Sequence, residues 1–180
     1  MNQTENPDIS QSANPAKAKS SRFLVIARYL LLSLGILTIA LLLGGQMGLL
    51  SGKRPVGLGA QNGQLKPAPS TRNCVSSQAT SDYHKIAPLA YTGDPQAAFD
   101  RLKGVVNAMP RAMIISSKPG YLYAEYTTKL LGFVDDVEFY LDEKAGVIQV
   151  RSASRLGRED FGVNRARIET IRAAFNNASN

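Results

Sequence analysis

The chain has 180 residues, of which 44% are apolar and 19% are charged, with a formal net charge of +7. This composition is ordinary for one globular domain with additional segments. One cysteine and one histidine exclude an intramolecular disulfide and a metal site of paired thiolates, and we predict no metal and no cofactor. The basic residues are scattered and tryptophan is absent, so we predict no nucleic-acid partner.

The N-terminal part combines a polar segment with a long apolar one. Residues 1–22 are rich in Asn, Ser, Gln, Ala and Pro, which predicts disorder because too little apolar surface is available for burial. Residues 29–50 form a stretch of 22 positions without a charge. At about 1.5 Å per residue, such a helix crosses a hydrocarbon core of about 30 Å. We therefore predict a single transmembrane helix over residues 23–50.

The apolar segment is interpreted as a retained anchor rather than a cleaved signal peptide. It exceeds the usual signal core of about 7–15 residues, and the nearest tolerable cleavage site, near Ala60, is late. Four basic residues precede the span and two follow it, and basic residues favour the cytoplasmic side. They are Lys17, Lys19, Arg22 and Arg28, followed by Lys53 and Arg54. We expect the C-terminal domain on the periplasmic or lumenal side.

The region after the span divides into a linker and a domain. Residues 51–72 are rich in Gly, Pro, Ser, Asn and Gln, which predicts a linker, with the folded domain over 73–178. The domain begins with a stretch without sustained period, which we expect to be an extended lead-in. A helix follows, capped by Asp94, with Pro95 at its first position and Pro110 ending it.

Four strands and a second helix complete the domain. The strands are predicted in residues 112–118, 121–130, 133–142 and 146–154. The last helix carries a stripe at spacings of three and four, formed by Phe161, Asn164, Ile168, Ile171 and Phe175. Alternatively, Asn164 is the N-cap and the helix starts at Arg165. Short connections predict an α+β fold in which an antiparallel four-stranded meander has both helices on one face.

The last two predicted strands form a hairpin. Its register follows because alternate side chains of a strand point to opposite faces of the sheet. The four-residue loop "EKAG" places Gly146 in a left-handed position and pairs Asp142 with Val147. Counting back, Glu138 faces Arg151. A slip of one residue would set apolar side chains against charged ones, so we predict a cross-strand ion pair here.

The hairpin and the start of the last helix hold the candidate ligand-binding residues. These are Asp135, Asp136, Glu138, Arg151, Ser152, Ser154, Arg155, Asn164 and Arg165. They fit either a structural ion-pair network that ties the sheet to the last helix or the floor of an anion or metabolite pocket. We favour the network, because an arginine partner favours the charged form of a carboxylate and makes it a poor proton donor. For Asp135 we expect donors among Ser154, Arg155 and Arg165.

The lone thiol and the lone imidazole are weak candidates for catalysis. Cys74 and His84 are ten residues apart in the lead-in, and nothing in the sequence fixes them together. A structural thiol is favoured, with intermolecular oxidation as the alternative. We predict no catalytic residue.

Several blocks of the sequence resemble a known family. They are "NCVSSQ", "IAPL", "GFVDDVEF", "VRSASRLG" and "DFGVNRARIETIR", in this order between residues 68 and 175. Together they resemble the domain of unknown function family 1499, which has no assigned activity. The resemblance implies an envelope or thylakoid setting. Many relatives are similar to Cys-Pro-x-Ser-x-Asn-Cys at the lead-in, whereas this chain has Ala68 at the first cysteine position.

The sequence thus favours a membrane-anchored, non-catalytic accessory or interaction module. Its expected partners are the bilayer and another membrane or lumenal protein. The alternative is a small-molecule, anion or lipid-headgroup binding protein, or an enzyme not recognised from its motifs, that uses the charged hairpin.

Overall fold

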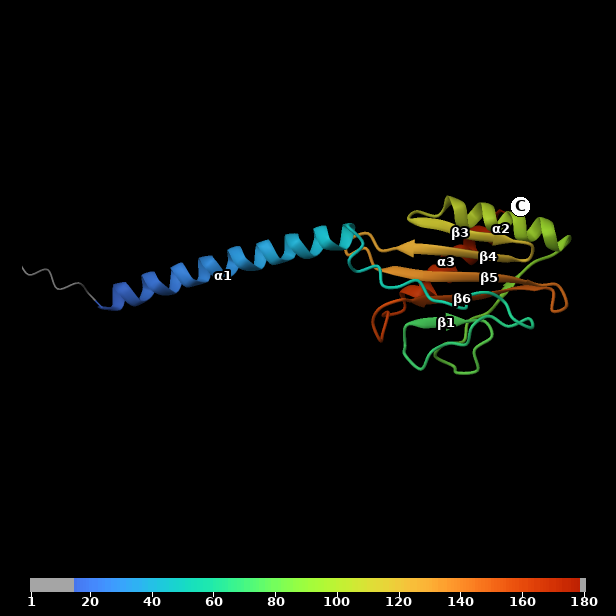
Figure 1. Ribbon diagram of the computed structural model, residues 1–180, viewed down its shortest axis with the longest axis horizontal. Coiled ribbons are helices and arrows are strands. Elements are labelled where there is room, and N and C mark those ends of the chain that lie inside the picture. Colours follow the sequence, from blue (N-terminus) through green and yellow to red (C-terminus); the bar gives the residue numbers. More distant parts are fainter. Residues whose placement is uncertain (1–14, 179–180) are drawn as a thin grey trace, which may run out of the picture. The chain divides into compact units, whose positions relative to one another are not determined.

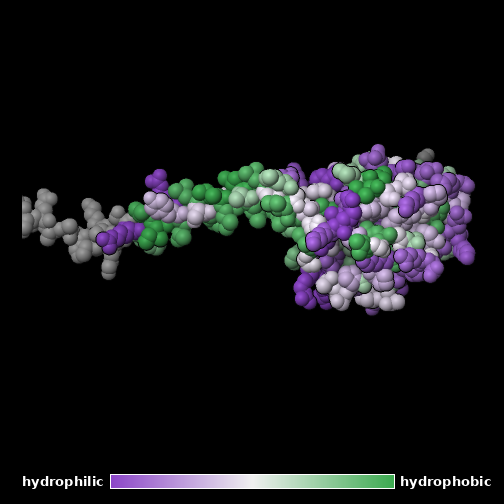
Figure 2. All heavy atoms as spheres, viewed as in Figure 1, coloured by the Kyte–Doolittle hydropathy of each residue, from purple (hydrophilic) through white to green (hydrophobic). Residues whose placement is uncertain are grey.

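A computed structural model describes residues 15–178 (Figure 1). The chain divides into two compact units that meet between Leu41 and Leu42. Helix α1 (Pro15–Gln46) makes up the described part of the first unit and supplies the first residues of the second. Its stretch Arg22–Gln46 is long and apolar enough to cross a membrane, and an N-terminal signal sequence has the same properties. Figure 2 shows that hydrophobic residues make up most of the surface of this stretch.

The bounds of α1 differ from the prediction at both ends. The expected disorder of residues 1–22 lies outside the described residues up to position 14, whereas residues 15–22 are helical. The helix ends at Gln46 instead of Leu50, because Gly48 adopts a left-handed conformation with a φ of 81° and residues 47–50 form turns.

The second unit contains an antiparallel sheet of six strands rather than four (Figure 1). The strands are β1 (Cys74–Ser76), β2 (Leu89–Ala90), β3 (Ala112–Lys118), β4 (Tyr121–Thr127), β5 (Val134–Asp142) and β6 (Val147–Ser154). They follow the order β1-β6-β5-β4-β3, and β2 also pairs with β6. The predicted meander is β3 to β6. The two additional strands come from the lead-in and are three and two residues long, too short to show an alternating pattern in the sequence.

Two helices pack on one face of the sheet. Helix α2 (Pro95–Ala108) starts with the predicted cap, since the Asp94 carboxylate accepts a bond of 2.7 Å from the Ala97 amide. Helix α3 (Val163–Asn177) buries Asn164, Ile168, Ile171 and Phe175. The apolar sides of both helices and the facing sheet residues form one core cluster.

The start of α3 corrects two predictions. Phe161, expected in the buried stripe, precedes the helix and is 90% exposed. Asn164 is not the N-cap: Gly162 occupies that position, and Asn164 is fully buried inside the first turn. The helix therefore begins two residues before Arg165.

Residues 54–68, expected to be part of a linker, pack on the other face of the sheet, and we call them the strap. Arg54 Nε lies 2.5 Å from the Glu125 carboxylate on β4. The Gly59 amide donates to Glu138 on β5 at 2.9 Å, and Leu65 is buried. The strap makes these contacts through a backbone amide and isolated side chains. The amino-acid composition of the segment therefore did not distinguish it from a free linker.

The last turn of α1 contacts the connection between β4 and β5 within the second unit. Gln46 Nε2 donates to the carbonyl oxygens of Lys129 and Leu130, at 2.9 and 3.2 Å. A Cβ atom on Gly45 would lie 2.5 Å from the Leu131 carbonyl oxygen, and one on Gly132 would collide with the Gly45 carbonyl oxygen. Only glycine allows the two backbones to approach this closely.

Candidate functional site

The hairpin of β5 and β6 has the register that parity predicts. Asp142 pairs with Val147 and Glu138 with Arg151, and Gly146 has a left-handed φ of 67° in the turn. Alternation then sends Glu138, Asp136 and Arg151 to the strap side and Asp135 and Ser152 to the helix side. The candidate residues are therefore split between two faces of one hairpin.

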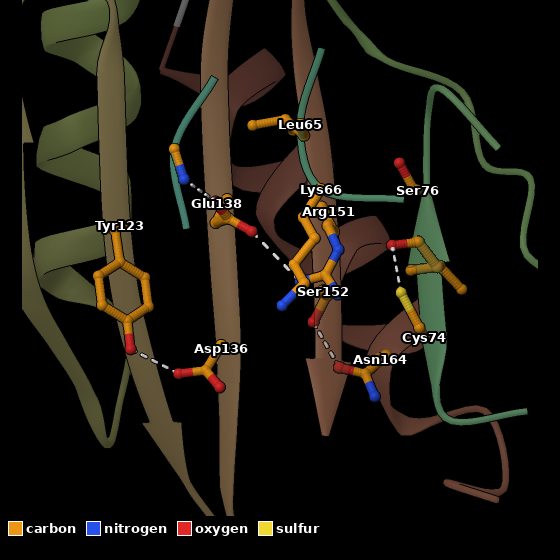
Figure 3. Close-up of polar contacts among 12 residues, drawn as sticks. Leu65, Lys66, Cys74, Ser76, Tyr123, Asp136, Glu138, Arg151, Ser152 and Asn164 are labelled. Atoms are coloured by element: carbon orange, nitrogen blue, oxygen red, sulfur yellow. Dashed lines mark hydrogen bonds and ion pairs between the residues drawn. The ribbon is translucent and has the colours of Figure 1, made fainter. Parts of the chain in front are cut away.

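Glu138 is the centre of the network on the strap side (Figure 3). Its Oε2 accepts a bond of 3.2 Å from Arg151 Nη1, and both side chains are buried. Its Oε1 accepts from the Gly59 amide at 2.9 Å and from the Tyr121 hydroxyl at 2.8 Å. Burial and the neighbouring Glu138 carboxylate raise the pKa of Tyr121, so its hydroxyl stays protonated and remains a donor.

Asp136 forms a second cluster with Arg155 and two residues of β4. Arg155 donates to it from Nε at 3.0 Å and from Nη2 at 2.7 Å, and the Tyr123 hydroxyl donates at 2.5 Å. Glu125 also accepts from Arg155 and Tyr123 and pairs with Arg54 of the strap. Burial alone would raise the pKa of Glu125, but its bonds to Arg54, Tyr123 and Arg155 lower the pKa on balance.

On the helix side, a third cluster joins the hairpin to α3. The Asp135 carboxylate pairs with Arg167, whose Nη1 donates to Ser152 at 3.0 Å and to Asn164 at 2.8 Å. Asn164 also donates to Ser154 at 2.9 Å. These bonds link the first turn of α3 to both strands of the hairpin.

One residue of this third cluster was missed and one was misplaced. Arg167 bonds Asp135, in place of the expected donors Ser154, Arg155 and Arg165. Arg155 bonds Asp136 instead, and Arg165 donates to the Tyr83 carbonyl oxygen at 2.6 Å. Arg167 lies three positions after the buried Asn164, so the two share a helix face. The spacing of three from Asn164, a member of the predicted stripe, is the signal that could have placed Arg167 toward the sheet.

Cys74 and His84 do not form a reactive pair. Cys74 is 1% exposed on β1, and burial raises the pKa of its thiol to about 11. The protonated thiol is a weak nucleophile. The His84 ring nitrogens bond the Ser81 hydroxyl at 3.2 Å and the Thr71 carbonyl oxygen at 3.0 Å. His84 thus joins two loop segments.

Each of the three candidate carboxylates of the hairpin therefore has an arginine partner in its own chain. Glu138 pairs with Arg151, Asp136 with Arg155, and Asp135 with Arg167. Within residues 15–178, no three His, Cys, Asp or Glu side chains gather closely enough to hold a metal ion. The arrangement is suited to holding the strap, the sheet and α3 together.

Two hollows lie near these clusters. One of about 410 Å³ is lined by strap residues together with Ser76 and Gln78. The other, of about 310 Å³, is lined mainly by apolar side chains such as Phe133 and Phe161, and Asp135 and Ser154 also reach it.

Comparison with protein families gives a match to the part of the sequence that forms the end of the strap, the sheet and the last helix. A family model described as "Protein of unknown function (DUF1499)" matches residues 64–175. The chain belongs to this family. Comparisons with curated proteins and with solved structures give no match.

The DUF1499 match contains the hairpin, the Asp135–Arg167 pair and the end of the strap. It begins at Gln64, next to the buried Leu65. The DUF1499 domain thus includes part of the segment that its composition indicated to be a linker.

Proposed function

We propose that this protein is a non-catalytic accessory module, anchored by α1, whose DUF1499 domain lies on the periplasmic or lumenal side of an envelope or thylakoid membrane. The apolar stretch Arg22–Gln46 supports the anchor. Four basic residues stand before the charge-free residues 29–50 and two after them, which supports the side.

The observation that carries the non-catalytic role is the internal pairing of the hairpin carboxylates. Asp135, Asp136 and Glu138 are buried, and each is bonded by an arginine. A proton donor or acceptor needs a group that can reach a substrate and change its protonation state. Carboxylates that are buried and bonded by arginine are therefore better suited to stabilising the fold than to catalysis.

The edge of the sheet supports a role in protein interaction. Strand β3 is the last strand of the sheet, and no described strand pairs with its outer side. Met113 on this strand is 65% exposed. An unpaired edge can receive a strand from another protein. We therefore propose β3 as the contact site for a membrane or lumenal partner.

Cross-linking of the full-length protein in its native membrane tests this role. A photo-reactive residue at Met113 should capture a discrete partner, whereas the same residue at Lys144, on the exposed β5–β6 turn, should not. Asp136→Asn keeps the shape of the site and removes a charged carboxylate, and it should leave capture unchanged. Equal capture from both positions, or loss of capture in Asp136→Asn, would contradict the proposal.

A second candidate function is binding of a small molecule near the hairpin. The observation in its favour is that Asp135 and Ser154 line the apolar hollow of about 310 Å³. Detection of a bound metabolite by native mass spectrometry of the purified full-length protein would support it. Loss of that adduct in Ser154→Ala would place the ligand at this hollow.

A further inference from the structure

A basic groove lies between the end of β4 and the start of α3. It has a volume of about 360 Å³. We call it the cationic groove, and its main lining residues are Arg111, Tyr126, Lys129, Val163, Arg167 and Thr170. None of these belongs to the candidate residues proposed from the sequence.

The two exposed cations of the groove have no carboxylate partner within residues 15–178. Arg111 donates from Nε to the Thr127 carbonyl oxygen at 3.1 Å, which leaves its positive charge unneutralised. Lys129 forms no ion pair in the same range. Arg111 also has a left-handed φ of 59°, an uncommon conformation for a residue other than glycine. Such strain is found where the surrounding structure fixes a functional position.

A buried hydroxyl of a residue that lines the groove lacks a partner. Tyr126 is 7% exposed, and its hydroxyl bonds no other group of the described residues. The guanidinium of Arg167 lies over its ring, 5.0 Å from the centroid. Leaving a buried hydroxyl unbonded is unfavourable, so most such groups have a protein, water or ligand partner. An anionic oxygen atom in the groove would accept this hydrogen bond.

An apolar hollow adjoins the groove. It is the hollow of about 310 Å³, and it shares Thr128 and Val163 with the groove. Leu156 and Phe161 line it and are exposed. Glu159 and Asp160 also line it, and Asp160 accepts bonds from Asn164. These carboxylates disfavour an anion in the hollow and leave the phosphate to the groove.

Both hollows lie beside the residues at which the chain leaves α1. Gln46, the last residue of α1, donates to the Lys129 carbonyl oxygen at the rim of the groove. A Cβ atom on Gly52 would lie 2.9 Å from the Arg155 Cβ atom and 3.1 Å from the Leu156 Cγ atom. Cations beside an apolar surface at the end of a membrane span match the headgroup and acyl region of an anionic leaflet.

We propose that the cationic groove binds the phosphate of an anionic phospholipid, with the acyl chains of the lipid against the apolar hollow. Arg111 and Lys129 neutralise the phosphate, and the Tyr126 hydroxyl donates a hydrogen bond to it. This proposal rests on the proposed membrane anchoring. It adds a specific lipid as ligand, with its phosphate held by residues outside the charged hairpin.

Native mass spectrometry of the full-length protein in an uncharged detergent tests the proposal. The probes are dioctanoyl phosphatidylglycerol, dioctanoyl phosphatidylcholine and glycerol 3-phosphate. Phosphatidylglycerol should bind at least about tenfold more tightly than each of the others, since only it combines a net negative charge with acyl chains. Equal binding of phosphatidylcholine, or equal binding of glycerol 3-phosphate, would overturn the lipid assignment.

Variants locate the site. Arg111→Gln with Lys129→Gln should weaken phosphatidylglycerol binding at least about tenfold. The control, Lys103→Gln with Lys118→Gln, removes two exposed charges outside the groove and should bind as the wild type does. Tyr126→Phe should melt no lower than the wild type yet bind phosphatidylglycerol more weakly. Unchanged binding in the groove variants would overturn the proposal.

Carbonate washing of membranes tests the proposed anchoring separately from the lipid site. If carbonate washing leaves the full-length protein in the membrane fraction but phosphatidylglycerol does not bind, the anchor holds and the lipid site is wrong. If the protein is released but phosphatidylglycerol binds selectively, the anchor is wrong and the groove is a lipid site of a soluble domain.

Discussion

Asp135 shows how a single carboxylate ties the sheet to the last helix. Its side chain is 4% exposed, that of its partner Arg167 is 12% exposed, and Arg167 also bonds Ser152 and Asn164. A charge buried without its partner is strongly unfavourable. The contribution of Asp135 is therefore best measured by the cost of removing it.

Asp135→Ala should lower the free energy of unfolding by about 3–5 kcal/mol, because it leaves Arg167 buried without its carboxylate. Glu169→Ala is the matched control, since Glu169 pairs with Arg172 on the surface and is 52% exposed. A surface pair contributes about 0–1 kcal/mol. Chemical denaturation of both variants gives the comparison. Similar denaturation midpoints for the two variants would show that the Asp135–Arg167 pair does not stabilise the fold.

Cys74 predicts a pH dependence of stability. Burial raises the pKa of its thiol from 9.0 to about 11 in the folded chain. The unfolded chain therefore loses this proton first, and stability falls as the pH rises from 9 through 11. Between pH 8 and pH 11 the wild type should lose about 2 kcal/mol more than Cys74→Ala does. Urea denaturation at both pH values measures this, and identical losses would contradict the buried state of the thiol.

At the scale of elements, the register of the hairpin was predictable from the sequence. The ion pair between Asp135 and Arg167, which joins the hairpin to α3, was predictable only in part. The register followed because alternation fixes which of Glu138 and Val150 can face the core. Arg167 was missed because the predicted stripe was followed mainly through apolar side chains, although Arg167 lies three positions after Asn164, a member of that stripe. The strap was missed because Gly- and Pro-rich composition is the same in a free linker and in a segment held by an amide such as that of Gly59.

The contact between α1 and the β4–β5 connection predicts different effects for two left-handed glycines. Gly132 and Gly146 both have φ near 65°, at 64° and 67°. A Cβ atom on Gly132 would collide with the Gly45 backbone, whereas one on Gly146 meets open space. Gly146→Ala should cost about 1–2 kcal/mol for the backbone conformation alone. Gly132→Ala should cost clearly more in thermal unfolding of the full-length protein. Equal costs would show that Gly45 and Gly132 are not in contact.

At the scale of the whole molecule, the two units combine a candidate membrane span with a DUF1499 domain. The long apolar helix was predictable from the sequence because its length and composition are those of a candidate membrane span. The function of the domain was not predictable, because the charged residues of its hairpin pair with arginines of the same domain in three clusters. Its chemistry therefore has to be sought at surfaces such as the β3 edge and the cationic groove.

The side of the membrane on which the domain lies is the central claim, and thiol labelling tests it directly. Cys74 itself is unsuitable because it is 1% exposed. The full-length variant Cys74→Ser with Lys144→Cys places a single thiol on the exposed β5–β6 turn. An impermeant maleimide should label this thiol when it is applied from the periplasmic or lumenal side, before the cytoplasmic or stromal face is opened. Labelling only from the cytoplasmic or stromal side would contradict the account.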